Sequence, residues 1–367
     1  MRSVTTVAAG MLLAGTMAPQ ALANQINTGG ETGAYHASFC PQVETQLKKA
    51  KFDYTCTTSE GSRENIQRVI ADPTQVGFSQ LDVFALEGAT YGGEDLFKVM
   101  RSDLGRECLF LVSRNPEFTS FGDIASYADQ IRFILPPAKS GVTGTFEFLQ
   151  QIDPDGLGRA RNITYAESAD EAIDLALAAD DTVTLVVQFP DPKNTRFKTI
   201  HEQSGNIIPV IDRNILRQEI GGQKVYYAEE TEISMPKWNK SAEKVVTACT
   251  PMVLFTGAPA RVDEGNARKD QEDLIKTIEA VKVEDLQPKQ GFFSKLWKRT
   301  KEISAVSVEK MVDVSQKARE KAKPTLDKAL ERAKEMKDQA TEGAKELYDE
   351  AKKKMGTGSE TSTDGQN

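Results

Sequence analysis

The chain has 367 residues, of which 39% are hydrophobic and 27% are charged, and its formal net charge is −8. These values exclude a wholly disordered or fibrous chain, and no nucleic-acid partner is expected. The length allows two ordinary domains, or one two-lobed domain with an appendage.

Residues 1–23 have the pattern of a secretory signal peptide. Arg2 gives the positive start, residues 4–17 the apolar middle, and Ala-Leu-Ala at 21–23 the cleavage pattern. We therefore expect cleavage after Ala23 and a mature protein in the periplasm. The alternative is a membrane anchor, but Gly and Pro residues interrupt a tract already shorter than the about 20 apolar residues of a membrane span.

All four cysteines, Cys40, Cys56, Cys108 and Cys249, follow the cleavage point. In an oxidising compartment an even number indicates disulfides, with three possible connectivities. The sequence has no C-x-x-C pair, so neither a metal site nor a cofactor is expected. His36 lies four residues before Cys40 and could form a nucleophile pair with it. We prefer half of a disulfide and a surface histidine.

The body of the chain alternates between strands and helices. In chain order, strand patterns lie at 52–58, 130–137, 161–166 and 182–190, and helix patterns lie at 62–72, 143–152 and 168–180. Residues 74–86 indicate a strand followed by a turn or helix. This alternation predicts βαβ units and mostly parallel sheets.

Two halves of the body are weakly similar to each other. Residues 31–39 and 142–149 share Thr-Gly, a small residue and an aromatic residue, and residues 62–82 resemble residues 169–191. Gln80 and Gln188 end the second match. The same order at nearly one offset predicts two related lobes.

Three glycine-containing or serine-containing loops precede predicted helices. Thr32 and Thr143 could cap a helix or donate to an anion, and Gly33 and Gly144 would let the backbone approach it. Residues 58–62 repeat this pattern after the next strand. Because helix starts attract carboxylate or phosphate, the loops predict an anion site, with plain helix capping as the alternative. Nucleotide-binding, G-x-S-x-G, H-E-x-x-H and EF-hand motifs are absent from the sequence, so an enzyme is not expected.

Residues 29–43, 57–85 and 140–149 resemble the TAXI-type solute receptors associated with TRAP transporters. The resemblance covers roughly residues 25–285. It implies an α/β fold of the type II periplasmic-binding-protein class, with two lobes joined by two crossover strands and closing on a small organic acid or amino acid. The C-terminal helical extension is not part of the usual receptor, and the returning segment at 232–259 matches only loosely. The candidate ligand-binding residues are Gly30, Thr32, Gly33, Tyr35, Ser59, Ser62, Ser79, Gln80, Asp82, Ser140, Thr143, Gly144, Thr145 and Gln188.

In this two-lobed arrangement, lobe 1 spans about 24–108 and 249–285, and lobe 2 about 109–248. The apolar runs beside Cys108 and Cys249 would be the crossover strands. Because neighbouring antiparallel strands bring opposite residues within disulfide range, we predict a Cys108–Cys249 bond. Cys40 on the first helix and Cys56 on the following strand should form the other.

The composition changes near residue 286. Residues 1–285 hold 28 Lys and Arg against 40 Asp and Glu, whereas residues 286–355 hold 18 against 12. The sequence thus predicts an acidic body, a basic amphipathic helical arm at 286–355, and a disordered tail at 356–367. Residues 291–355 could contact a membrane surface or an envelope partner, or the arm could pack on the body.

We predict a periplasmic receptor that captures a small carboxylate, a dicarboxylate or acidic amino acid, for a TRAP-type permease. The rival is an envelope interaction or sensing protein built on the same fold, which docks through its arm. A Cys/His hydrolase is a third, more distant hypothesis.

Overall fold

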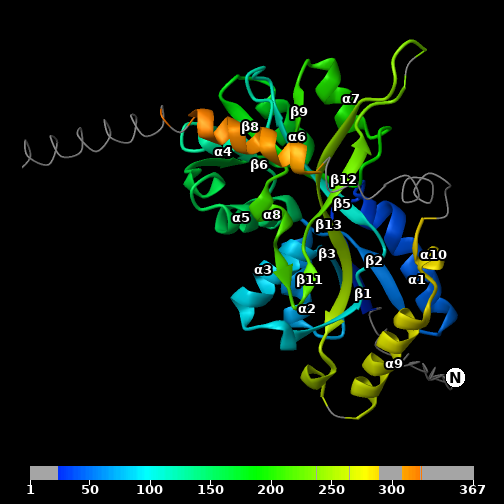
Figure 1. The fold of residues 1–367 in the computed structure, drawn as a ribbon. Helices are drawn as coiled ribbons and strands as arrows, with labels where there is room; N and C mark the ends of the chain where they lie inside the picture. Colours follow the sequence, from blue (N-terminus) through cyan, green and yellow to red (C-terminus); the bar gives the residue numbers. More distant parts are fainter. Residues whose placement is uncertain (1–23, 237, 264, 289–307, 323, 325–367) are drawn as a thin grey trace, which may run out of the picture.

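The computed structural model describes residues 24–236, 238–263, 265–288, 308–322 and 324. The predicted signal peptide lies outside these residues. The described chain forms two α/β lobes, stacked one above the other in Figure 1. Two strands, β5 (Arg106–Ser113) and β13 (Lys244–Gly257), lie at the junction and pair with each other.

Lobe 1 is built on the first three strands. Its elements are β1 (Asn24–Asn27), a π-helix (Tyr35–Phe39), α1 (Cys40–Lys49), β2 (Tyr54–Thr57), α2 (Ser62–Ala71), β3 (Val76–Gln80), α3 (Leu81–Tyr91), β4 (Phe97–Arg101), α9 (Asn266–Ala280) and α10 (Val283–Leu286), with short 3-10 helices at Glu94–Leu96 and Pro259–Arg261. The strand order is β2-β1-β3-β13, in which β1 runs parallel to β2 and β3, and β13 runs antiparallel to β3.

Lobe 2 repeats this plan. Its elements are α4 (Phe121–Ser126), β6 (Arg132–Leu135), α5 (Gly141–Ile152), a 3-10 helix (Leu157–Arg159), β7 (Asn162–Tyr165), α6 (Ala169–Ala176), β8 (Thr182–Gln188), α7 (Thr195–Glu202), β9 (Asn206–Pro209), α8 (Arg213–Leu216), β10 (Glu219–Ile220), β11 (Gln223–Lys224) and β12 (Tyr227–Glu232). The order β7-β6-β8-β5 matches that of lobe 1, with β5 antiparallel to β8. The strands and helices expected from the sequence are present, and the internal similarity corresponds to this repeated βαβαβ unit.

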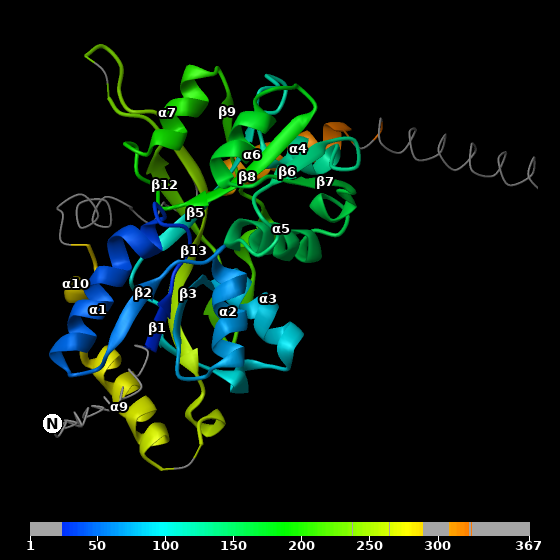
Figure 2. The same cartoon turned by 180° about the vertical axis from the view of Figure 1, so that it is seen from behind.

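Helices cover both faces of the sheet in lobe 1. Figure 2 shows α1 and α9 on one side of the strands and α2 and α3 on the other. The strand β3 is buried along its whole length, as is β8 in lobe 2. A strand covered on both faces needs a mainly apolar sequence without strict alternation, and both strands have one.

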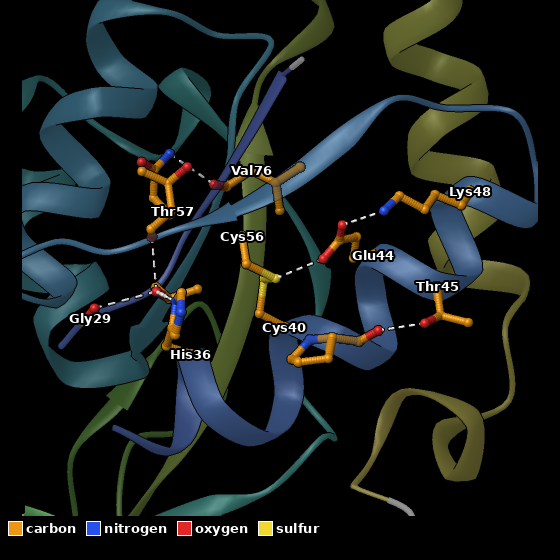
Figure 3. Close-up of a disulfide and its surroundings, with 12 residues drawn as sticks. Gly29, His36, Cys40, Glu44, Thr45, Lys48, Cys56, Thr57 and Val76 are labelled. Atoms are coloured by element: carbon orange, nitrogen blue, oxygen red, sulfur yellow. Dashed lines mark hydrogen bonds and ion pairs between the residues drawn. A yellow bond between two sulfur atoms is a disulfide. The ribbon is translucent and has the colours of Figure 1, made fainter. Parts of the chain in front are cut away.

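Both predicted disulfides are present. Cys40–Cys56 joins the start of α1 to β2 (Figure 3). Cys108 and Cys249 are direct partners in the β5–β13 ladder and close a sequence separation of 141 residues. His36 pairs through Nδ1 with the Thr28 hydroxyl at 3.0 Å rather than with a thiol. The bonded cysteines suit an oxidising, extracytoplasmic compartment.

Part of the predicted arm is a helix, residues 308–322, which packs on lobe 2 (orange in Figure 1). Its Arg319 makes a bidentate ion pair with Asp153, at 2.9 and 2.8 Å. The Arg319 guanidinium also lies 3.5 Å from Asp212 and over the Phe121 ring. The remaining arm residues, and the predicted tail, lie outside the described residues. No helix in the described part of the chain has the length and apolar character to cross a bilayer.

Candidate functional site

A cavity of about 470 Å³ lies between the two lobes. Lobe 1 contributes the loop after β1 and the first turn of the π-helix. The strand β5, one of the two crossover strands that form the hinge between the lobes, contributes Glu107. Lobe 2 contributes the end of β8 and the start of α7. Both β1 and β8 are parallel strands whose carboxyl ends open at the cavity, which is where α/β sheets usually bind ligands. The volume is in the range of small-molecule sites.

Gln188 is the clearest polar group of this cavity. It is the last residue of β8 and is only 5% exposed. Neither its amide oxygen nor its amide nitrogen has a hydrogen-bond partner in the described part of the protein. Buried side-chain amides are normally hydrogen-bonded, so the missing partner makes Gln188 a candidate ligand contact.

Glu107 forms the hinge side of the cavity. It is 7% exposed, and the Tyr35 hydroxyl donates a hydrogen bond of 2.5 Å to its Oε2. Burial, helped by the nearby Asp82 charge, raises the pKa of Glu107 to about 8, against the bond from Tyr35. Glu107 is therefore mostly protonated at neutral pH, and a protonated carboxyl can donate a hydrogen bond to an anion.

Arg196 contributes a positive charge from the first turn of α7. Its Nε donates to Asp170 at 2.6 Å, and its backbone N–H donates to the side chain of Asn194, the N-cap of the helix. Asp191, on the same side, has its pKa raised by burial. The cavity therefore combines the Arg196 guanidinium, which is paired with Asp170, the carboxyl of Asp191, a helix start and a protonated Glu107. Among these groups, the guanidinium, the helix start and the Glu107 hydroxyl are donors that suit a carboxylate.

The structure brings only some of the predicted ligand residues to this cavity. Thr32, Gly33, Tyr35 and Gln188 line it. Gly30 lies in the same exposed loop, where its carbonyl accepts from the Gly33 N–H. Thr32 does not cap a helix, because the residue before the π-helix is Ala34, which makes no side-chain cap.

The other two predicted helix starts face each other instead of an open space. A Cβ atom on Gly61, before α2, would lie 3.0 Å from the Gly141 nitrogen at the start of α5. Gly144 is likewise at a packing contact, because a Cβ atom there would lie 2.8 Å from Val83 of α3. The expectation that Gly144 lets backbone approach a ligand is therefore corrected: this glycine lets helices from the two lobes approach each other.

The hydroxyl groups near these helix starts are used internally. Ser59 donates to Asn65 at 2.6 Å. Ser140, not Thr143, caps α5 by accepting from the Thr143 N–H, and the Thr143 hydroxyl donates to the Pro136 carbonyl. Ser79 donates to the carbonyl of the following residue.

The remaining candidates form a buried polar layer between the lobes. Ser62 donates to the side chain of Gln80, in a short bond. Asp82 accepts from the Tyr226 hydroxyl of lobe 2 at 2.8 Å, and burial raises the pKa of Asp82. Thr145 is fully buried. These residues support the closed contact between the lobes.

An arginine fastens the same contact. Arg63 of α2 donates through Nε to Glu87 of lobe 1 at 2.6 Å. Its two terminal nitrogens bind Glu147 of lobe 2 at 3.0 and 2.9 Å. The described arrangement is therefore one in which the lobes are closed on each other.

Sequence reasoning missed Glu107 and Arg196. A signal for Glu107 existed, because it is a lone carboxylate at the start of the apolar run that was predicted to cross between lobes. Arg196 carries no such signal, since it follows an ordinary loop and only the fold brings it to the cavity.

No protein-family model and no curated protein matches this sequence. Among solved structures, the GluR0 ligand-binding core in complex with L-glutamate is 9% identical, with a TM-score of 0.41, over 80% of this chain and 98% of the other. An ABC-type phosphate transport receptor from Vibrio cholerae is 10% identical, with a TM-score of 0.39, over 72% and 96% of the two chains. Such similarities say nothing of a ligand.

The strand order itself carries the fold assignment. In each lobe a central strand is flanked by two parallel strands, and a crossover strand pairs antiparallel with one of these two. This chain therefore has the predicted two-lobed α/β fold of type II periplasmic binding proteins, and the resemblance to TAXI-type receptors stays a prediction.

Proposed function

We propose that this protein is an extracytoplasmic receptor that captures a small carboxylate, a dicarboxylate or acidic amino acid, between its lobes. The observation that carries the proposal is the buried Gln188, whose amide has no partner within the described residues and which lines the interlobe cavity. Glu107 and Arg196 provide a donor and a positive charge beside it. The fold is one typically used for binding rather than for catalysis.

The receptor would deliver its ligand to a TRAP-type permease. This part of the proposal is supported by the sequence resemblance of the glycine loops. Closure around a ligand presents a different surface from the open form, and a membrane partner can distinguish the two.

The test is a thermal-shift screen of the purified full chain against small carboxylates and acidic amino acids, with neutral sugars as the comparison. A ligand at about 100 times its Kd stabilises by about 2.7 kcal/mol, enough for a shift of several degrees. Arg196→Gln should abolish the shift, whereas Lys198→Gln, the same charge change at an exposed position of the same helix, should not. Stabilisation by sugars alone would refute the proposal.

The rival function, docking to the envelope through the arm, is favoured by one observation. Arg319 holds helix 308–322 on lobe 2, so the rest of the arm is joined to a fixed place on the body. Flotation with anionic vesicles would test this function: the full chain should bind and a chain ending at residue 290, which lacks the whole arm segment 291–355, should not.

A further inference from the structure

A second cavity, of about 410 Å³, lies between lobe 2 and helix 308–322. Its walls come from α8, from the chain around β11 and β12, and from the first turns of the helix. It shares no lining residue with the interlobe cavity. The apolar surface of the cavity is formed by Leu216, Ala228, Val308 and Val312. Val312 belongs to a buried hydrophobic cluster, and the other three pack against that cluster.

Three cations surround this apolar surface. Arg213, Arg217 and Lys224 line the cavity, and none of them has an ion pair or side-chain hydrogen bond within the described residues. Among the described residues that line the cavity, Glu309 has the single carboxylate. Because residues 1–285 carry twelve more acidic than basic side chains, three such cations around one cavity are a local reversal of the charge of the body.

The outer wall of the cavity is firmly placed. Helix 308–322 is fastened to lobe 2 by the bidentate pair between Arg319 and Asp153. Gly122 allows its close approach, since a Cβ atom there would lie 2.0 Å from the Ser315 carbonyl oxygen. The cavity thus lies between lobe 2 and a helix that the Arg319–Asp153 pair holds on lobe 2.

We propose that this cavity is a second binding site and that it takes an aliphatic carboxylate of medium chain length. The apolar surface fits the hydrocarbon chain, and Arg213, Arg217 and Lys224 fit the carboxylate. A neutral apolar ligand would leave the three cations without partners, and a small inorganic anion would leave the apolar surface unused. The volume lies at the lower end of the range for small-molecule sites.

The experiment is a calorimetric titration of the full chain with sodium decanoate below its micelle concentration. Acetate provides the head without the chain, and decyltrimethylammonium provides the same chain with the opposite charge. We expect saturable binding of one decanoate and no saturable binding of the other two. Equal binding of the cationic surfactant, or no binding of decanoate, would overturn the proposal.

Variants locate the site. The double variant Arg213→Gln, Arg217→Gln should weaken decanoate binding at least tenfold. The single variant Lys224→Gln, at an exposed position, threatens folding least and should weaken binding severalfold. The control is Arg114→Gln with Arg132→Gln, two exposed arginines of the same lobe, which should leave the affinity unchanged. If Gln188→Leu instead removes decanoate binding, decanoate occupies the interlobe cavity and the proposal is wrong.

Discussion

Replacing Glu107 by Gln should change how the stability of this protein depends on pH. Burial raises the pKa of Glu107 from 4.5 to about 8 in the folded state. Below pH 4.5 the carboxyl is protonated in both the folded and the unfolded state, so burial carries no ionisation penalty. Between pH 4.5 and pH 8 only the unfolded chain releases the proton, so the free energy of unfolding falls as pH rises. Above pH 8 the loss is complete.

The size of this effect is set by the two pKa values. At about 1.36 kcal/mol per pKa unit, the change from 4.5 to about 8 amounts to about 5 kcal/mol. About 4 kcal/mol of it should develop between pH 5 and pH 9. Domains are commonly stable by only about 5–15 kcal/mol, so the wild-type protein should weaken markedly at alkaline pH. Gln cannot ionise, and its side-chain oxygen can still accept from Tyr35.

The assay is urea unfolding of both proteins, without ligand, at pH 5, 7 and 9. The difference in unfolding free energy between Glu107→Gln and wild type should grow in favour of the variant as pH rises. Glu117→Gln, the same replacement at an exposed position, should follow the wild type. If wild type and Glu107→Gln change in parallel to within about 1 kcal/mol from pH 5 to pH 9, Glu107 is not the buried acid described here.

Three further outcomes are expected. Gln188→Leu should keep the fold and weaken ligand binding by about 1–3 kcal/mol, measured by calorimetry, because a buried ligand group loses its partner; unchanged affinity would remove Gln188 from the site. Affinity for a carboxylate should fall as pH rises through about 8, because Glu107 ionises there and repels the ligand. Glu107→Gln should not show this fall. The same fall in both proteins would contradict the role of Glu107. Arg319→Met should lower the free energy of unfolding, measured in urea, by about 2–4 kcal/mol. The reason is that Asp153 and Asp212, whose side chains are each 5% exposed, lose their cation. A loss below about 0.5 kcal/mol would show that Arg319 does not hold helix 308–322 on lobe 2.

The sequence predicted the fold well because the fold depends on patterns that are local. Alternating apolar runs and helical periods indicated the βαβαβ unit of each lobe. Cys108 and Cys249 could be paired because both lie in long apolar runs, one at each end of the predicted second lobe. The helix predicted at 143–152 is present as α5, but it begins two residues earlier, at Gly141, and Ser140 rather than Thr143 caps it.

The candidate site was predicted less completely, for a physical reason. A Ser or Thr beside a helix start can satisfy a backbone group, a neighbouring side chain or a ligand, and the sequence does not distinguish these partners. In this protein Ser59 and Thr143 bond within their own lobes. Which helix starts face an open cavity depends on how the lobes close. The contact of Gly144 with Val83 joins residues 61 positions apart and has no local signature.

The hinge disulfide also fixes the covalent topology of the molecule. Because Cys108 is bonded to Cys249, the chain between them is a closed ring that contains every element of lobe 2 except helix 308–322. A single peptide-bond cut in this ring, for example beside the fully exposed Trp238, would leave one covalently connected molecule. The fragments would separate on a denaturing gel only after reduction. The nicked protein would therefore keep both lobes joined through β5 and β13, and the ring protects lobe 2 from being lost to a single proteolytic event.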